Sequence, residues 1–191
     1  NPLSDSYCTP LWLTAMLPTV DLDPSSNPRS TVRARRTYSL EKKLDGLKGY
    51  DYVILDCPPS TGILTQNALY YADEVIIPST MEPLSVDSVK KLMRFIADFS
   101  KQTGHPIKIS RIVPTIFDKR NKISTTILNE LRNEFYQKIG EPIRINSKLR
   151  EAPRSNRSIF MYAPSSPGAK DYKTLVNMVL QGESSKFKTR S

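Results

Sequence analysis

The sequence predicts an α/β protein with a mostly parallel sheet that is covered by helices on both faces. Three short apolar runs have the length and composition of buried strands, and each is followed by a segment with helical spacing of apolar residues. Apolar strands that alternate with helices are typical of a parallel sheet buried on both sides. At 191 residues the chain is long enough to form a domain with a proper core.

The predicted strands and helices follow one another from residue 51 onward. The predicted strands are Tyr52–Asp56, Val75–Ile77 and Ile107–Ile116. The predicted helices are Thr61–Tyr71, a helix from Val86 to about Phe99 that Ser85 can cap, one that contains Ile127–Phe135 and ends near Gly140, and Gly168–Leu180. We therefore expect a poorly defined segment 1–49 with one helix at about Leu40–Leu47, an α/β domain 50–181, and a flexible basic tail 182–191.

The composition narrows the class of protein before any motif is considered. No apolar run approaches the about 20 residues that a membrane-spanning helix needs, and Leu11–Leu17 is too short and lacks the basic region of a signal peptide. Cys8 and Cys57 are the only cysteines, which argues against a disulfide framework and for a reducing cytoplasm. A single histidine, His105, without Cys or His partners argues against a zinc site.

The net charge of +9 is unevenly distributed along the chain. Residues 51–100 carry seven acidic and three basic residues, whereas residues 101–160 carry thirteen basic and five acidic residues. Nearly the whole excess, +8, therefore lies in one 60-residue segment. Any single Lys or Arg is best explained as a solvated surface charge, but their concentration in one segment favours a polyanionic partner.

A single carboxylate, Asp56, ends the first predicted strand, and Pro58 and Pro59 stop that strand from continuing. In a parallel α/β sheet, ligands bind at the carboxyl ends of the strands. A carboxylate there can hold Mg²⁺ through water, because Mg²⁺ prefers oxygen ligands and keeps several waters. An acid at this place can also cap the next helix, so four apolar residues followed by Asp leave both interpretations open.

Longer stretches of sequence support the metal-binding interpretation. The stretch ILDCPPSTGILTQNAL (54–69) resembles the Walker B region of the ParA/MinD family of deviant P-loop ATPases. Three further stretches resemble, in the family's order, its next strand with a Glu-Pro turn, its loop with an Arg before a helix, and its closing block: ADEVIIPSTMEPLSVDSVKKL, TIFDKRNKIST and LREAPRSNRSIFMYAPSSPGAKDYKTL. Together they cover about residues 50–180, and the closest resemblance is to chromosome- and plasmid-partition ParA/Soj proteins.

The resemblance implies a P-loop NTPase-like fold that binds ATP and Mg²⁺, with Asp56 as the Walker B acid that holds the metal through water. It also implies that Pro58, Pro59 and Glu82 lie near the nucleotide. The family's Gly-rich loop with two lysines is missing, since none of the seven glycines is followed by Lys-Ser or Lys-Thr. The chain starts at Asn1 without a methionine, so we expect either a fragment of a longer protein or a trimmed chain. Because the phosphates have no cradle, we expect no ATPase activity from the chain as given.

The segment TVDLDPSSNPRST has two interpretations. Asp21 to Pro24 resembles the family's switch motif, in which an Asp orients the hydrolytic water, and Asp23 is then the corresponding residue. Only 33 residues separate Asp23 from Asp56, a spacing that instead favours alignment with a later segment of the family that leads into Walker B. A further departure is Arg144, which stands where the family has a proline near the adenine.

The resemblance also implies partners. Family members bind DNA without sequence preference through exposed basic residues, which correspond here to Arg120 and Lys148, with Lys122 and Arg150 beside them. An ATP-dependent homodimer, a ParB-like partner protein and a cytoplasmic, nucleoid-associated location are implied in the same way. Two alternatives stay open: a degenerate ParA-like interaction module without ATPase activity, and a MinD-like membrane-associated ATPase, against which the polar tail 183–187 argues.

Overall fold

The computed structural model describes residues 13–18, 44 and 50–187. The motif with Asp21 and Asp23 lies outside the described residues, and so does the predicted helix at Leu40–Leu47, apart from residue 44, which is helical. By its internal contacts the chain divides into two compact units. The first unit consists of residues 1–77 and 87–109, and the second of residues 78–86 and 110–191.

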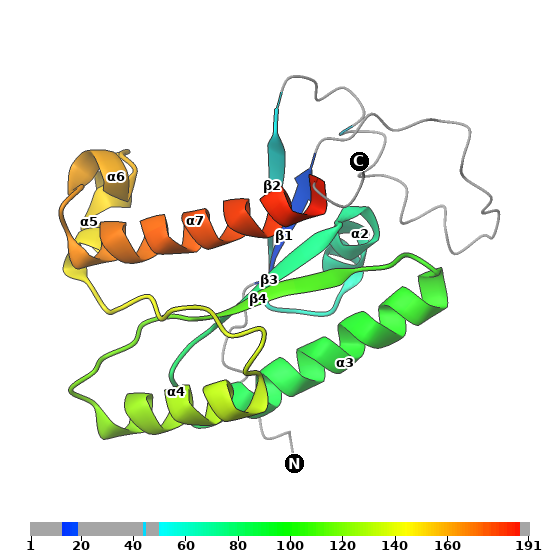
Figure 1. Cartoon of the computed structure of the whole chain (residues 1–191), viewed down its shortest axis with the longest axis horizontal. Helices are drawn as coiled ribbons and strands as arrows, with labels where there is room; N and C mark the ends of the chain where they lie inside the picture. The colour runs from blue at the N-terminus through cyan, green and yellow to red at the C-terminus, as the bar shows by residue number, and fades with distance from the viewer. Residues whose placement is uncertain (1–12, 19–43, 45–49, 188–191) are drawn as a thin grey trace, which may run out of the picture. The chain divides into compact units, whose positions relative to one another are not determined.

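Three strands meet in the first unit, although the last two residues of β3 belong to the second unit (Figure 1). β1 spans Leu13–Pro18, β2 spans Tyr52–Cys57 and β3 spans Glu74–Ser79. β1 lies between the other two and is antiparallel to both, so that Thr14 pairs with Asp56 on one side and with Ile76 on the other. β2 and β3 therefore run in the same direction, as predicted, whereas β1 is a strand that was not predicted.

The helices of the first unit form where apolar residues recur at helical spacing. α2 spans Ile63–Tyr71 and begins two residues later than predicted, because Gly62 serves as its N-cap. α3 spans Ser85–Thr103 and starts at the serine that was predicted to cap it. The least exposed large side chains of this unit, which form its core, are Leu69, Val75, Ile77, Val89 and Ile96.

β4 spans Lys108–Pro114 and runs parallel to β3. The N–H of Lys108 donates to the carbonyl of Asp73 at the start of the two strands, and the N–H of Thr115 donates to that of Ser79 at their end. The order of the sheet is β2-β1-β3-β4. The three predicted strands thus share one direction, which confirms the mostly parallel α/β class.

Within the second unit, an irregular segment runs beside the C-terminal half of β4. α4 spans Lys122–Glu134 and ends before the predicted Gly140, because the chain turns back along β4 after Phe135. Parallel bridges then join Ile112 to Ile139 and Phe117 to Arg144. The apolar stripe of α4 is buried, as its spacing predicted, through Ile127, Leu128 and Leu131.

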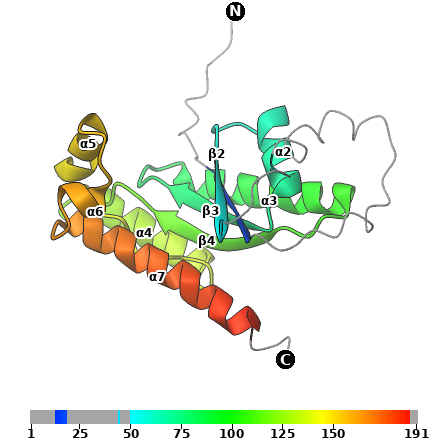
Figure 2. The same ribbon diagram turned by 90° about the horizontal axis from the view of Figure 1, so that it is seen from above.

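Three further helices complete the second unit (Figures 1 and 2). α5 spans Ser147–Arg154, α6 spans Ile159–Tyr162, and α7 spans Pro167–Phe187, which is longer than predicted. In both views α5 and α6 lie beside the N-terminal end of α7. A Cβ added to Gly168 of α7 would lie 2.8 Å from Leu149 Cγ of α5, so this close approach requires glycine.

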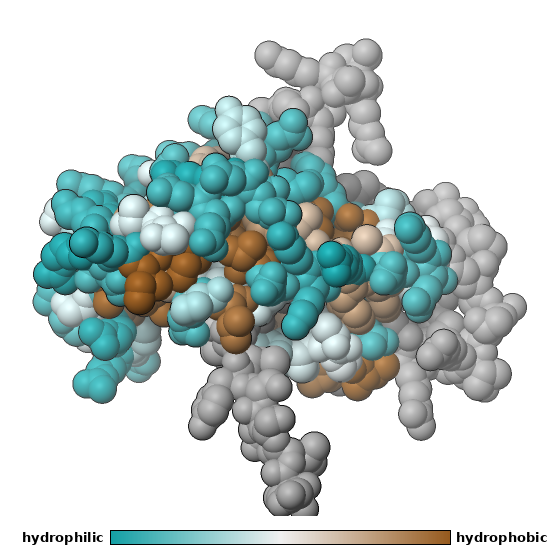
Figure 3. All heavy atoms as spheres, turned by 90° about the horizontal axis from the view of Figure 1, so that it is seen from below, coloured by the Kyte–Doolittle hydropathy of each residue, from teal (hydrophilic) through white to brown (hydrophobic). Residues whose placement is uncertain are grey.

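Hydrophilic side chains cover much of the face drawn in Figure 3. Apolar side chains form separate patches between them. In the part of the chain that the structure describes, no helix has both the length and the apolar character needed to cross a membrane.

Candidate functional site

The predicted strand-end acid lies on the exposed face of β2. Side chains alternate along a strand, so Cys57 is buried and Leu55 half-buried, whereas Asp56 between them is exposed. Burial, followed by the charge of Asp56, raises the pKa of the Cys57 thiol, which therefore stays protonated at neutral pH. Asp56 is thus accessible to a ligand, and its neighbour is a packed, neutral side chain.

The loop after β2 is tied to α2 by hydrogen bonds. Thr65 Oγ1 donates to the carbonyl of Ser60 at 2.5 Å and lies 3.5 Å from the carbonyl of Pro58. Pro58 and Pro59 are exposed, and neither has an N–H that could bind a phosphate. The loop therefore positions the end of β2 and offers a ligand few donors of its own.

Of the parts of a nucleotide site, the residues present fit only the carboxylate that holds the metal ion. Asp56 offers exposed carboxylate oxygens of the kind that Mg²⁺ binds through its water shell. Glu82 belongs to the second unit, where its N–H donates to Ser85 Oγ at 3.2 Å and its side chain is exposed. No group of three or more His, Cys, Asp or Glu side chains suited to a metal ion occurs among the described residues. Because the sequence also lacks a Gly-rich loop with Lys, these residues alone do not fit a nucleoside triphosphate.

Two of the predicted DNA-binding residues lie in the loop before α4 and at the first position of that helix. Arg120 donates from Nε and Nη2 to the two carboxylate oxygens of Asp118, each at 3.1 Å. These hydrogen bonds lower the pKa of Asp118. Asn121 caps α4 by accepting from the N–H of Ile123 at 2.9 Å, and Lys122 follows it as an exposed first residue of the helix.

α5 carries the other two predicted DNA-binding residues. Its N-cap, Asn146, accepts from the N–H of Lys148 at 2.8 Å. Lys148 Nζ lies 2.7 Å from Glu151 Oε2, and the same oxygen accepts from Tyr162 OH at 2.9 Å. Hydrogen bonds from Lys148 and then Tyr162 lower the pKa of Glu151, while the bond to Glu151 raises the pKa of Tyr162. Glu151 thereby joins α5 to α6, and Arg150 stays exposed beside this network.

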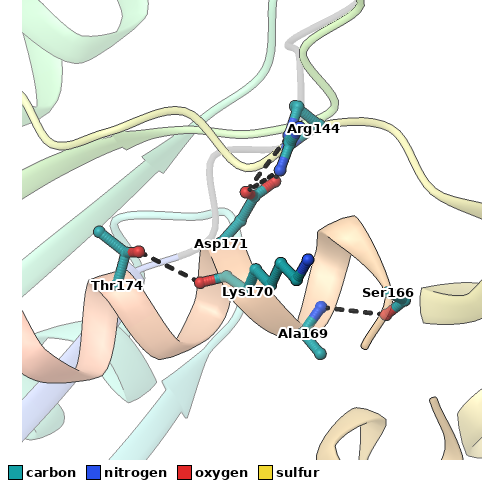
Figure 4. A network of polar contacts seen from close by, with 6 residues as sticks. All are labelled: Arg144, Ser166, Ala169, Lys170, Asp171 and Thr174. Carbon is teal, nitrogen blue, oxygen red and sulfur yellow. Dashed lines mark hydrogen bonds and ion pairs between the residues drawn. The ribbon is translucent and has the colours of Figure 1, made fainter. Parts of the chain in front are cut away.

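Arg144 is tied to α7 (Figure 4). Its Nη2 donates to Asp171 Oδ1 at 2.6 Å, its Nε donates to Oδ2 at 2.9 Å, and its backbone N–H donates to the same Oδ2 at 3.0 Å. The hydrogen bonds to Asp171 raise the pKa of Arg144. The guanidinium is therefore occupied, and a ligand would have to displace a bidentate carboxylate to reach it.

The carboxylates that pair with these cations were not predicted. The spacing of Lys148 and Glu151, three residues apart in a helix, is a signal that could have identified one pair. Arg144 and Asp171 are 27 residues apart, so no local pattern in the sequence indicates their contact.

The fold is an α/β domain of the P-loop NTPase type, as its similarity to a solved nucleotide-bound structure shows. A family model described as an AAA domain matches residues 18–109. The chromosome partitioning protein ParA of Caulobacter vibrioides is 30% identical over 177 residues, which cover 87% of this chain and 66% of that protein. The chromosome-partitioning ATPase Soj of Treponema pallidum is 30% identical over 170 residues, which cover 88% of this chain and 67% of that protein. Among solved structures, the chain is similar to cobyrinic acid a,c-diamide synthase from Mycobacterium smegmatis, whose crystal structure contains bound ADP and magnesium. The two sequences are 30% identical, the TM-score of the two structures is 0.63, and the match covers 81% of this chain and 57% of that one.

This chain belongs to the ParA/Soj family of partition ATPases, with a P-loop NTPase-like fold. The predicted family and the predicted fold class are both confirmed. The chain spans less than two thirds of the length of the Caulobacter relative, at 66%. The Mycobacterium structure, which shares the fold, contains the nucleotide and the metal ion of the predicted class.

Proposed function

We propose that this chain is part of a partition ATPase and binds DNA through basic residues of its second unit, without sequence preference. The observation that carries the proposal is the set of exposed cations at the start of α4, in the loop before it, and on α5: Arg120, Lys122, Lys148 and Arg150. Long basic side chains on loops and short helices can reach phosphates without disturbing the core. The family supports the proposal, because the Caulobacter and Treponema relatives are chromosome-partitioning proteins.

The proposed contacts are electrostatic. Phosphate contacts position a protein on a duplex but carry no sequence information, and the sequence contains neither a helix-turn-helix nor a zinc-finger pattern. Arg120 and Lys148 would each exchange a carboxylate for a phosphate, whereas Lys122 and Arg150 would bind directly. Affinity should therefore fall steeply as salt rises.

The nucleotide chemistry belongs, in this proposal, to a longer protein that supplies a phosphate-binding loop. ATP and Mg²⁺ would then be the cofactors, with Asp56 holding the water shell of the metal and with Pro58, Pro59 and Glu82 beside the nucleotide. Asp23, outside the described residues, is the candidate switch residue. An ATP-dependent homodimer, a ParB-like partner protein and a cytoplasmic, nucleoid-associated location complete the proposal.

A second candidate is a ParA-like interaction module that binds its partner without hydrolysing ATP. The lack of a Gly-Lys-Ser or Gly-Lys-Thr stretch in the sequence favours it. The reading frame upstream of Asn1 discriminates between the candidates. A Lys-Gly-Gly-x-Gly-Lys-Thr loop encoded there would support the ATPase, and its absence would support the interaction module.

A salt titration of binding to several unrelated duplexes tests the DNA proposal. The proteins are the wild type, the variant Arg120→Ala with Lys148→Ala, and a matched control, Lys91→Ala with Arg94→Ala, which removes two exposed cations from α3. The wild type should bind all duplexes alike, and the first variant should lower the salt slope by about one unit per lost contact. The control should keep the wild-type slope. Affinity that depends on the sequence of the duplex would contradict the proposal, and an unchanged slope in the first variant would remove Arg120 and Lys148 from the DNA surface.

A further inference from the structure

Three exposed arginines, two within α5 and one just after it, have no ion-pair partner within the described residues: Arg150, Arg154 and Arg157. Arg120, Lys148 and Arg144, in contrast, each form an ion pair, with Asp118, Glu151 and Asp171 respectively. Arg150 and Arg154 are four residues apart in α5, a spacing at which like charges repel. The three arginines thus form a concentrated positive charge without internal compensation.

The turn after α5 holds the third arginine in a defined place. Asn156 has a φ of 49°, in the left-handed region that Asn tolerates better than most residues. The N–H groups of Ser155 and Arg157 both donate to the carbonyl of Ala152, at 3.0 and 3.2 Å. The chain therefore folds back at once after the helix, and Arg157 is kept next to its last turn.

Contacts with the neighbouring helices anchor α5 itself. Glu151 is bonded to Tyr162 of α6, and Leu149 packs where Gly168 of α7 leaves room. The backbone that carries the three arginines is thereby fixed before any partner arrives, which reduces the entropy lost on binding. The negative end of the helix dipole explains a basic residue at Arg154, in the last turn, but gives no reason for Arg157 beyond the helix.

The chemistry of this surface fits a polyphosphate backbone. A guanidinium offers a planar fork of donors that matches a phosphate, and it is less strongly hydrated than an ammonium. Residues 147–158 contain no exposed large hydrophobic side chain, since Leu149 is half-buried and Ala152 is buried. Exposed apolar side chains flank this stretch at Ile145, Phe160 and Met161. The choice of nucleic acid over an acidic polypeptide therefore rests on the guanidinium groups themselves, and binding to polyglutamate distinguishes the two partners.

We propose that Arg150, Arg154 and Arg157 form a phosphate-binding row that makes the main contacts with the DNA backbone. This inference rests on the proposed DNA-binding function. The unpaired arginines take up a phosphate without losing an internal ion pair, whereas Arg120 and Lys148 must first release Asp118 and Glu151. The row therefore contributes more to affinity than the two paired cations do.

The test compares binding to unrelated duplexes, over a range of salt, for the full chain and for three variants. The triple variant Arg150→Gln, Arg154→Gln, Arg157→Gln should lose almost three units of salt slope and roughly 100-fold or more in affinity at about 0.1 M salt. The triple Lys variant at the same positions, which keeps the charges, should retain the slope. The variant Arg120→Ala with Lys148→Ala should lose less affinity than the triple Gln variant. Circular dichroism and thermal unfolding confirm that each variant is folded.

The outcomes separate the inference from the function on which it rests. A wild-type chain that binds no duplex overturns both. A wild type that binds with a steep slope, together with a folded triple Gln variant that binds equally well, overturns the row alone. Binding to polyglutamate is measured in the same way as binding to DNA. If the triple Gln variant no longer binds polyglutamate but still binds DNA, the row recognises an acidic protein and the inference is overturned.

Discussion

At the scale of single residues, carboxylates decide which cations of the second unit are available. Lys148 is the clearest case, because Glu151 Oε2 binds both its ammonium, at 2.7 Å, and the hydroxyl of Tyr162, at 2.9 Å. The pair is exposed, so it contributes little to stability. Its main effect is to keep Lys148 from other anions.

Glu151→Gln should therefore tighten DNA binding. The substitution removes a negative charge and frees Lys148 for one more phosphate contact, which can raise affinity by up to about tenfold at about 0.1 M salt. Equilibrium binding at fixed salt measures the change. Glu141→Gln is the charge-matched control. Glu141 is exposed, and its ion pair with Arg132 is long, at 3.8 Å, and involves none of the proposed DNA-binding residues. Equal gains in the two variants would show that net charge alone, and not the release of Lys148, is responsible.

Ile116 carries backbone strain at the end of β4. Its φ is 56°, in the left-handed region that β-branched residues rarely adopt, and its side chain is 58% exposed. Its neighbours impose this conformation, because the N–H of Thr115 donates to Ser79 and that of Phe117 donates to Ile143. The strain is therefore local, and burial of the side chain does not offset it.

Ile116→Asn should stabilise the protein by about 1 kcal/mol, because Asn adopts the left-handed region at lower cost. For a chain of this size the thermal midpoint should rise by about 2–4 °C. Ile123→Asn is the control, since Ile123 is similarly exposed, at 55%, but lies in α4. A rise of the same size in both variants would attribute the effect to the loss of exposed apolar surface and not to strain.

At the scale of the elements, the N-terminal end of α7 determines where α5 lies. Gly168 allows Leu149 to approach so closely that an added Cβ would lie 2.8 Å from Cγ and 3.0 Å from Cδ1. The Arg144–Asp171 pair holds the segment before α5 against the same helix. Packing at one glycine thus positions the basic residues that α5 presents.

Gly168→Ala should lower stability by about 1–3 kcal/mol, as overpacking of a close contact does, and should weaken DNA binding because α5 has to move. Chemical denaturation and duplex binding measure the two effects. Gly140→Ala is the control, since an added Cβ there meets only ordinary contacts, at 3.5–3.9 Å. Full retention of stability in Gly168→Ala would show that Leu149 rearranges freely and that the glycine does not position α5.

At the scale of the whole molecule, the two units carry different parts of the proposed function. Asp56 belongs to the first unit, whereas Glu82 and all of the proposed DNA-binding residues belong to the second. The basic excess of residues 101–160 falls mostly in the second unit as well. The acid proposed to hold the metal and the cations proposed to bind DNA therefore belong to separate compact units of the chain.

The 191-residue chain should show neither ATP hydrolysis nor nucleotide-dependent dimerisation, because it has no phosphate-binding loop. Its thermal midpoint should be the same with and without ATP and Mg²⁺, since a ligand stabilises only what it binds. Phosphate release, light scattering and thermal unfolding measure the three properties. Turnover that requires magnesium and disappears in Asp56→Ala would contradict the prediction and assign phosphate donors to this chain.

The class of fold, the family and the order of the predicted strands and helices could be predicted from local patterns. Val75–Ile77 and the stripe of α4 are read from the spacing of apolar residues, and Asp56 from its place at a strand end. These features depend on residues close together in the chain, where periodicity and turn chemistry act directly. The end of α4 was predicted too late, because pairing of the following segment with β4 overrides helical spacing there.

The rest follows from contacts between distant residues. The antiparallel place of β1 between β2 and β3, the pairing of Phe117 with Arg144, and the Arg144–Asp171 bond all join segments that no local pattern relates. The same holds for the cations. Their number and positions are evident in the sequence, but whether each one faces a carboxylate or solvent depends on which helix ends the fold brings together, because an ion pair forms only where two side chains meet in space.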